Sequence, residues 1–136
     1  MTSMTIIRYR EVEHRFELRP STLPNAGKGC FARVPMEVGD RMIVHGVLID
    51  PGSEADHCTA YADQYKFRVG RSLLIPFGFG AMVNHSPTPN LRKVVVEECL
   101  FLEAACPIDA GDELFLCYSD YALGRFFPPS PVTEAG

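Results

Sequence analysis

Three segments of the chain carry side chains whose types and spacing could do chemistry. The most polar is Asn84-His85-Ser86-Pro87-Thr88-Pro89-Asn90, which follows the apolar run Phe79–Val83. Asn84 and His85 both donate and accept hydrogen bonds, so they suit recognition of an adenine ring or of an amino-acid group. The alternative interpretation is a simple proline-rich turn without a ligand.

The second segment is a glycine-rich loop, Asn25-Ala26-Gly27-Lys28-Gly29-Cys30-Phe31. Two glycines around one residue let backbone amides surround an anion such as a carboxylate. We therefore expect a side chain at Gly29 to fill space that the ligand needs. The alternative is an ordinary loop, because the segment is not the GxGxxG dinucleotide-binding pattern.

The third segment is Glu113-Leu114-Phe115-Leu116-Cys117-Tyr118-Ser119-Asp120-Tyr121. On a β-strand, Leu114, Leu116 and Tyr118 face the same way. Taken alone, Tyr118 is more simply interpreted as an aromatic residue of the core, without a functional role.

The composition limits the classes of protein that could carry these segments. The chain has 136 residues, which fits one domain, and 46% of them are hydrophobic and 22% charged, as in a globular protein. No apolar run approaches the ~18 residues of a membrane span, and the N-terminus lacks the apolar core of a signal peptide. We therefore expect an intracellular, cytoplasmic protein that does not bind membranes.

The charge and the cysteines limit the partners further. A net charge of −4 argues against direct binding of nucleic acid and leaves room for a cationic substrate. The five cysteines include no CxxC pair and the histidines are scattered, so no disulfide framework and no metal site are expected. A cysteine-dependent hydrolase built on His57-Cys58 or on Cys30 is a weak alternative.

The elements that must position these segments are mainly short strands, because glycines and prolines are spread along the whole chain. The patterns predict an edge strand over Thr5–Val12, a strand over Met42–Ile49 and a last strand over Glu113–Tyr118. Two hairpins are predicted, one around Gly70-Arg71 and one around Glu97-Glu98-Cys99. The helical candidate is Ser53–Gln64, which Ser53 could cap. The proline-rich tail from Phe127 is expected to be extended and partly disordered.

An internal repeat accompanies this pattern. Ala32 to Met42 resembles Ala104 to Leu114, with Pro35 matching Pro107 and Gly39 matching Gly111. We interpret each copy as a corner between two strands, with an inward aliphatic residue and a glycine at positive φ. Coincidence is the alternative for so few positions.

Taken together and in order, the segments resemble the SET-domain family of protein-lysine methyltransferases. The resemblance rests on the glycine loop with the following Phe31, on the NHSxxPN pattern of Asn84–Asn90 and on the ELxxxY pattern of Glu113–Tyr118. It covers about residues 16–121 and implies a single SET domain over 1–136 with a tail over 122–136. The implied fold is mainly β, a β-clip of small twisted sheets with a threaded C-terminal segment and little helix.

The resemblance also implies a methyl donor, S-adenosylmethionine, and residues that would bind it. Its amino-acid end would lie at the glycine loop. Asn84 through its side chain and His85 through its backbone would hold it from the other side, and Tyr118 would be the catalytic residue at the inner end of a lysine channel. The donor-binding residues expected in this way are Gly27, Lys28, Gly29, Cys30, Asn84, His85 and Tyr118.

The substrate channel shows the clearest departure from the family pattern. The family's YxG tyrosine aligns with Val44, which has no hydroxyl, and residues 122–136 contain no cysteine-rich zinc module. Closure of the channel would then depend on the tail. The channel residues expected in this way are Val44, Phe79, Tyr121, Phe126 and Phe127.

The resemblance implies a protein substrate with an accessible lysine, and the net charge favours a basic segment around that lysine. The loss of a tyrosine at Val44 leaves an alternative open, a catalytically silent module that binds a peptide or the donor. A homodimer is a further expectation, since the tail could form a lid or a dimer contact.

Overall fold

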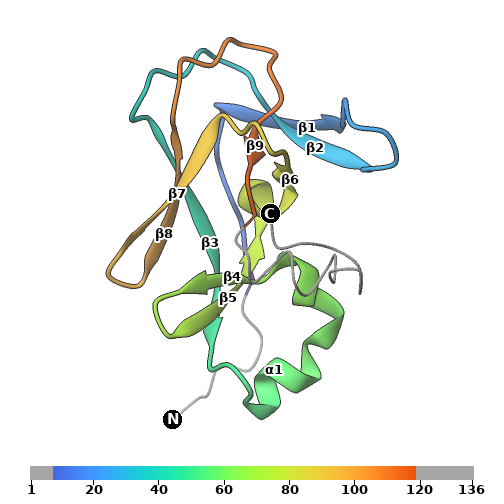
Figure 1. Cartoon of the computed structure of the whole chain (residues 1–136), viewed down its shortest axis with the longest axis vertical. Coiled ribbons are helices and arrows are strands. Elements are labelled where there is room, and N and C mark those ends of the chain that lie inside the picture. The colour runs from blue at the N-terminus through green and yellow to red at the C-terminus, as the bar shows by residue number, and fades with distance from the viewer. Residues whose placement is uncertain (1–7, 119–136) are drawn as a thin grey trace, which may run out of the picture.

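The computed structural model describes residues 8–118, and its elements are short strands with little helix (Figure 1). Nine strands form a two-stranded sheet, β1-β2, and a curled seven-stranded sheet with the order β4-β5-β3-β8-β7-β9-β6. The mainly β fold class expected from the sequence is therefore confirmed. The strands are β1 Phe16–Pro20, β2 Lys28–Ala32, β3 Arg41–Ile49, β4 Phe67–Val69, β5 Ser72–Phe77, β6 Asn84–His85, β7 Leu91–Val96, β8 Cys99–Ala104 and β9 Phe115–Leu116.

Both predicted hairpins are present in the large sheet. β4 pairs with β5 around a turn in which Gly70 has φ +59°, and β7 pairs with β8 around a turn in which Glu97 has φ +56°. β3 is the long strand through the middle of Figure 1 and pairs with both β5 and β8. Phe16, Met42, Leu102 and Leu114 are at most 2% exposed in the core between the sheets.

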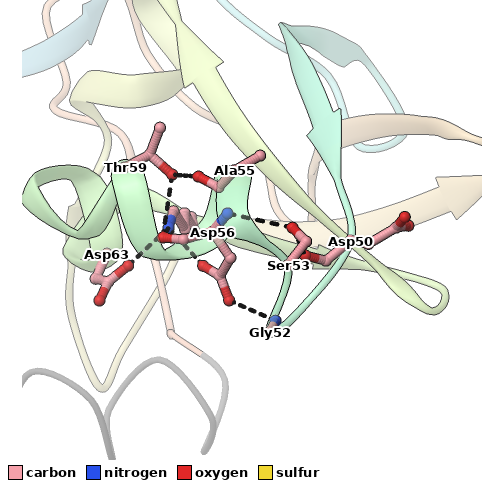
Figure 2. Close-up of polar contacts among 8 residues, drawn as sticks. Asp50, Gly52, Ser53, Ala55, Asp56, Thr59 and Asp63 are labelled. Atoms are coloured by element: carbon pink, nitrogen blue, oxygen red, sulfur yellow. Dashed lines mark hydrogen bonds and ion pairs between the residues drawn. The ribbon is translucent and has the colours of Figure 1, made fainter.

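The predicted helix over Ser53–Gln64 is broken into two pieces. α1 covers Glu54–Cys58, and a 3₁₀ helix, η1, covers Ala60–Tyr65; a second 3₁₀ helix, η2, covers Gly78–Met82. Ser53 caps α1 as predicted, since its Oγ accepts from the Asp56 amide at 3.2 Å, and Figure 2 shows this contact beside that of Asp56 with Gly52. The segment buries little apolar surface, which explains why it does not continue as one helix.

Lys66 ties this helical segment to the sheet. Its side chain is fully buried and donates to Asp56 Oδ1 at 2.6 Å and to Asp63 Oδ1 at 2.7 Å. Burial alone would lower the Lys66 pKa, but the two carboxylates outweigh burial and raise it. A charged lysine is therefore held at the point where η1 enters β4.

The last described strand runs between two strands that a single loop connects. β9 pairs in parallel with both β6 and β7, and the loop over 86–90 joins those two strands. The Ser86 amide donates to Leu116 O at 3.1 Å, and the Phe115 amide donates to Asn90 Oδ1 at 2.8 Å. The chain is therefore threaded under this loop, as expected, although the strand covers only two residues of the predicted Glu113–Tyr118.

The two copies of the internal repeat contact each other. Met36 and Ile108, the inward aliphatic residues of the two corners, exchange backbone hydrogen bonds of 2.8 and 2.9 Å and are each 2% exposed. Gly39 and Gly111 have φ of +96° and +93°, as the repeat predicted. The repeat therefore marks a pair of matching corners, and coincidence does not explain it.

The predicted edge strand over Thr5–Val12 is wrong for its described part, because residues 8–12 pair with no strand. They pack through side chains instead: Glu11 accepts from the Phe79 amide at 2.9 Å, and the Tyr9 ring lies 5.2 Å from that of Phe77. The predicted tail from Phe127 lies outside the described residues. Within residues 8–118, no helix has the length and apolar character needed to cross a membrane.

Candidate active site

The fold brings the three sequence segments together at the Asn84 side chain. Asn84 Nδ2 donates to the backbone oxygen of Lys28 in the glycine loop and to Glu113 Oε2, both at 3.2 Å. These contacts join residues that are 56 and 29 positions from Asn84 in the chain. The predicted convergence of the segments is therefore a feature of the structure.

We call the contact of the glycine loop with Asn84 and Glu113 the junction. Glu113 makes several of its hydrogen bonds. It is 5% exposed, and its two oxygens accept from Ser21 Oγ at 2.7 Å, from the Thr22 amide at 2.8 Å and from Thr22 Oγ1 at 2.6 Å, besides Asn84. Burial alone would raise the Glu113 pKa, but these hydrogen bonds outweigh it and lower the pKa. The sequence motif contained Glu113, yet nothing in the sequence revealed its partners at positions 21 and 22.

The two glycines of the loop have different reasons for lacking a side chain. Gly27 has φ +68° and open space where a Cβ would lie, as a loop that approaches a ligand requires. At Gly29 a Cβ would lie 3.2 Å from Asn84 Nδ2 and would overlap the Glu113 carboxylate. Glu113 therefore fills the space beside Gly29, and a contact of the ligand with Gly29 stays a prediction.

Tyr118 is held by two hydrogen bonds beside His85. Its hydroxyl donates to Val83 O at 3.1 Å, its amide donates to His85 Nδ1 at 3.0 Å, and the two rings lie 5.0 Å apart. Burial, followed by the nearby Tyr65 phenol, raises the Tyr118 pKa, so the hydroxyl is protonated at neutral pH. A phenol hydroxyl can accept a hydrogen bond as well as donate one.

Tyr118 lines a cavity of about 190 Å³ between β4, β7, β9 and the two 3₁₀ helices. The sequence did not single out most of the residues around it, because only the curled sheet brings the β4 edge close to β9. The lining residues are Gln64, Tyr65, Lys66, Phe67, Arg68, Gly80, Ala81, Val83, Lys93, Leu116, Cys117 and Tyr118.

Two predicted channel residues do not line this cavity. Val44 is 5% exposed and packs in the core against Gly80. A Cβ added at Gly80 would lie only 2.9 Å from the Val44 methyl groups. Phe79 packs against Phe16, with 6.0 Å between the ring centroids, and faces a different hollow next to Tyr9 and Glu11. The other predicted channel residues, Tyr121, Phe126 and Phe127, lie outside the described residues.

Cys30 gives no support to a hydrolase. Cys30 has no exposed surface, and burial raises the pKa of its thiol to about 12, so a reactive thiolate does not form there. Its contribution to the glycine loop is its backbone, since Cys30 O accepts from the Leu114 amide at 2.8 Å. Across residues 8–118, no three His, Cys, Asp or Glu side chains gather as a metal site would require.

The junction is compatible with the amino-acid end of S-adenosylmethionine. Gly27 offers open space at the glycine loop. Asn84 Nδ2 and the Glu113 oxygens already make hydrogen bonds within the protein, so the Asn84 amide oxygen is the group of the junction that can accept from the donor's ammonium. Donor-binding roles for Gly27, Lys28, Gly29, Cys30, Asn84 and His85 remain predictions.

The architecture described above is shared with solved structures from other organisms. A Plasmodium falciparum protein described as a histone methyltransferase aligns with a TM-score of 0.63 and 21% identity over 80% of this chain and 96% of its own. The Chaetomium thermophilum polycomb repressive complex 2, in an autoinhibited conformation bound to S-adenosylmethionine, aligns with a TM-score of 0.65 and 24% identity over 78% of this chain. A polycomb repressive complex 2 in its basal state gives 0.68 and 24% over 77%.

Residues 27–119 match the family model of the SET domain, and the chain therefore belongs to the SET-domain family. The chain spans only 15% of the polycomb chains that it matches, so the likeness there concerns this one domain. No curated protein matches the chain by sequence.

Glu113→Gln is expected to destabilise the protein by about 2 kcal/mol at pH 7, because an amide cannot accept all four hydrogen bonds that the carboxylate accepts. The native pKa of Glu113 is lowered, so its stabilisation is present above the ordinary value of 4.5 and is lost as the pH falls below it. Urea unfolding at pH 7 and pH 4 should therefore show a smaller difference between variant and wild type at pH 4. Glu98→Gln, at an exposed glutamate, is the control; an equal effect of both changes would contradict the role of Glu113.

Proposed function

We propose that this protein transfers a methyl group from S-adenosylmethionine to the side-chain amine of a lysine in a protein substrate. The observation that carries the proposal is the junction of the glycine loop, Asn84 and Glu113, with Tyr118 lining a cavity alongside it. When bound, the donor supplies an electrophilic methyl group on a sulfonium. The family match supports methyl transfer in general, and the lysine and the donor are the parts that we propose.

The chain's own residues then have separate roles. Gly27, Asn84 and the backbone at Lys28 and His85 bind the donor at the junction. Tyr118 accepts a hydrogen bond from the incoming amine and holds it in line with the methyl group, while its hydroxyl keeps its proton and donates it to Val83 O. Leu116 and Val83 supply apolar walls that exclude water from the cavity.

No general base is required at this site. A lysine with a pKa near 10.4 must lose its proton before it can react, which costs about 4.6 kcal/mol at pH 7. An apolar cavity lowers that pKa by desolvation, and the sulfonium charge lowers it further. Water can then take the proton before the amine enters.

The alternative function is a silent module that binds donor or peptide without transfer. The reason to consider it is that Val44 stands where the family has a tyrosine. The cavity contains a second phenol nonetheless, Tyr65, which lies close enough to Tyr118 to raise its pKa. This neighbour supports an active enzyme, because it can supply the hydrogen bond that Val44 cannot.

The charge of the substrate remains a separate proposal. The net charge of −4 favours a lysine within a basic segment, through attraction that salt screens. Methylation of a basic peptide should then slow as ionic strength rises. A rate that does not depend on salt, or a preference for acidic flanks, would contradict this proposal.

The test of the function is incubation of the purified protein with isotopically labelled donor and a lysate, followed by identification of labelled residues by mass spectrometry. Label on lysine side chains of protein is the expected result. Donor binding in calorimetry without label on any protein would favour the silent module, and absence of both binding and label would contradict the proposal.

A further inference from the structure

Lys93 is a half-buried lysine in the wall of the cavity that Tyr118 lines. The chain has three lysines. Lys66 is buried between two aspartates, and Lys28 is exposed on the glycine loop. Lys93 lies half-buried on β7 and lines the same cavity as Tyr118. The roles proposed above for the residues of the site do not include it.

The register of the sheet places Lys93 beside Tyr118. β7 and β9 run in parallel, with Leu91 opposite Leu116. Lys93 follows Leu91 by two positions on β7, so it faces the same side of the strand, and Tyr118 follows Leu116 by two positions, just beyond the end of β9. Their shared place in the wall of one cavity agrees with this register.

The electrostatics around Lys93 favour a reactive amine. Within residues 8–118, no carboxylate forms an ion pair with it, unlike Lys66. Burial, followed by the charge of Arg68, lowers the pKa of the Lys93 amine. A larger fraction of this amine is therefore neutral at pH 7, with a lone pair available for attack, than of a lysine in water.

We propose that Lys93 is itself a methyl acceptor and that it is methylated within its own molecule. This inference rests on the proposed methyl transfer and names a substrate for it. The neutral Lys93 Nζ forms a new N–C bond to the methyl carbon while the bond from that carbon to the sulfonium sulfur breaks. The electron pair of the broken bond stays on sulfur, which leaves as a neutral thioether, and the methylated ammonium can return a proton to water.

The first experiment incubates the purified full chain with S-adenosylmethionine alone and maps added methyl groups by mass spectrometry of peptides. Methylation of Lys93 is expected, and Lys93→Arg, which keeps the positive charge, should lose it. Tyr118→Phe should also lose it. Methyl groups on Lys28 or the N-terminus but not on Lys93 would overturn the inference.

A second arm tests whether the reaction occurs within one molecule. Lys93→Arg protein, which retains Tyr118, is mixed with Tyr118→Phe protein, which retains Lys93. Because Lys93 lies in the wall of its own cavity, the mixture should leave the Tyr118→Phe chains unmethylated. Methylation of those chains by their active partners would overturn the inference that each molecule modifies itself.

A third arm needs no donor. Acetic anhydride labels neutral amines, so the yield of acetylated Lys93 against pH reports its protonation in the free protein. Half-maximal labelling should occur at a lower pH than for lysine in a short peptide of the same local sequence. Equal values would overturn the reactive-amine argument.

The outcomes also separate this inference from the proposed function. Label on a lysate protein without methyl on Lys93 overturns only the inference. Absence of methyl transfer to both overturns both.

Discussion

Tyr118→Phe is expected to lower the rate of methyl transfer a hundredfold or more, about 2.7 kcal/mol of barrier, which is the usual scale for one lost positioning group. The change removes one oxygen and keeps the ring, so packing against His85 should persist. The Tyr118 hydroxyl donates to Val83 O, and loss of this bond should cost about 1 kcal/mol of stability. Donor affinity should stay nearly constant, because the junction at Asn84 is untouched.

The measurements are turnover with labelled donor, donor binding by calorimetry and urea unfolding. Tyr61→Phe is the matched control, since Tyr61 is 82% exposed and should lose almost nothing. Tyr121→Phe tests the alignment. Loss of turnover there but not at Tyr118 would show that the motif had been placed three residues too early, and wild-type rates for both variants would remove the site assignment.

Lys66→Met is expected to destabilise the fold by about 3 kcal/mol. Removal of the buried ammonium removes its ion pairs with Asp56 and Asp63, which is more costly than loss of a surface pair. Partial hydration should limit the cost, because the side chains of Asp56 and Asp63 are 12% and 31% exposed. Methyl transfer should also fall, since Lys66 and the neighbouring Tyr65 line the cavity.

Urea unfolding and circular dichroism measure this effect. Arg71→Met is the control, because it removes an exposed cation from the turn between β4 and β5 and should change stability by less than ~0.5 kcal/mol. If Lys66→Met unfolds at the same urea concentration as Arg71→Met, the buried ion pairs do not hold the helical segment in place.

The parts of the fold that could be predicted from the sequence are those that local chemistry decides. Gly70 marked a tight turn, Ser53 marked the start of a helix, and the matching Pro-to-Gly stretches marked two corners. Each signal depends on a few adjacent residues, so no knowledge of the distant chain was needed.

The predictions that failed concern contacts between distant segments. Residues 8–12 have the composition of a strand, yet Tyr9 and Glu11 find partners on η2 and its neighbours rather than along a strand edge. At Gly29 we expected a ligand as the neighbour, and the side chain that the structure places there is Glu113, 84 positions later. Local patterns cannot show which distant side chain arrives beside a glycine.

The candidate site likewise contains residues that the sequence located and residues that it did not. The motifs located Asn84 and Tyr118, because chemistry of this kind requires particular residue types at fixed spacing. Tyr65, Arg68 and Lys93 were not found, because they belong to segments of ordinary composition. They line the cavity because the curled sheet brings η1 and β4 close to β7 and β9.

The passage of β9 under the loop over 86–90 also constrains how the molecule folds. The strand that leads to Tyr118 can be seated only by insertion through that loop or by closure of the loop around it, and both need contacts between residues about thirty positions apart. Strands that depend on such non-local contacts form late. The hairpins can therefore form early, while Tyr118 reaches His85 in one of the last steps. In hydrogen exchange during refolding, the amides of Phe115 and Tyr118 should gain protection after those of β7 and β8.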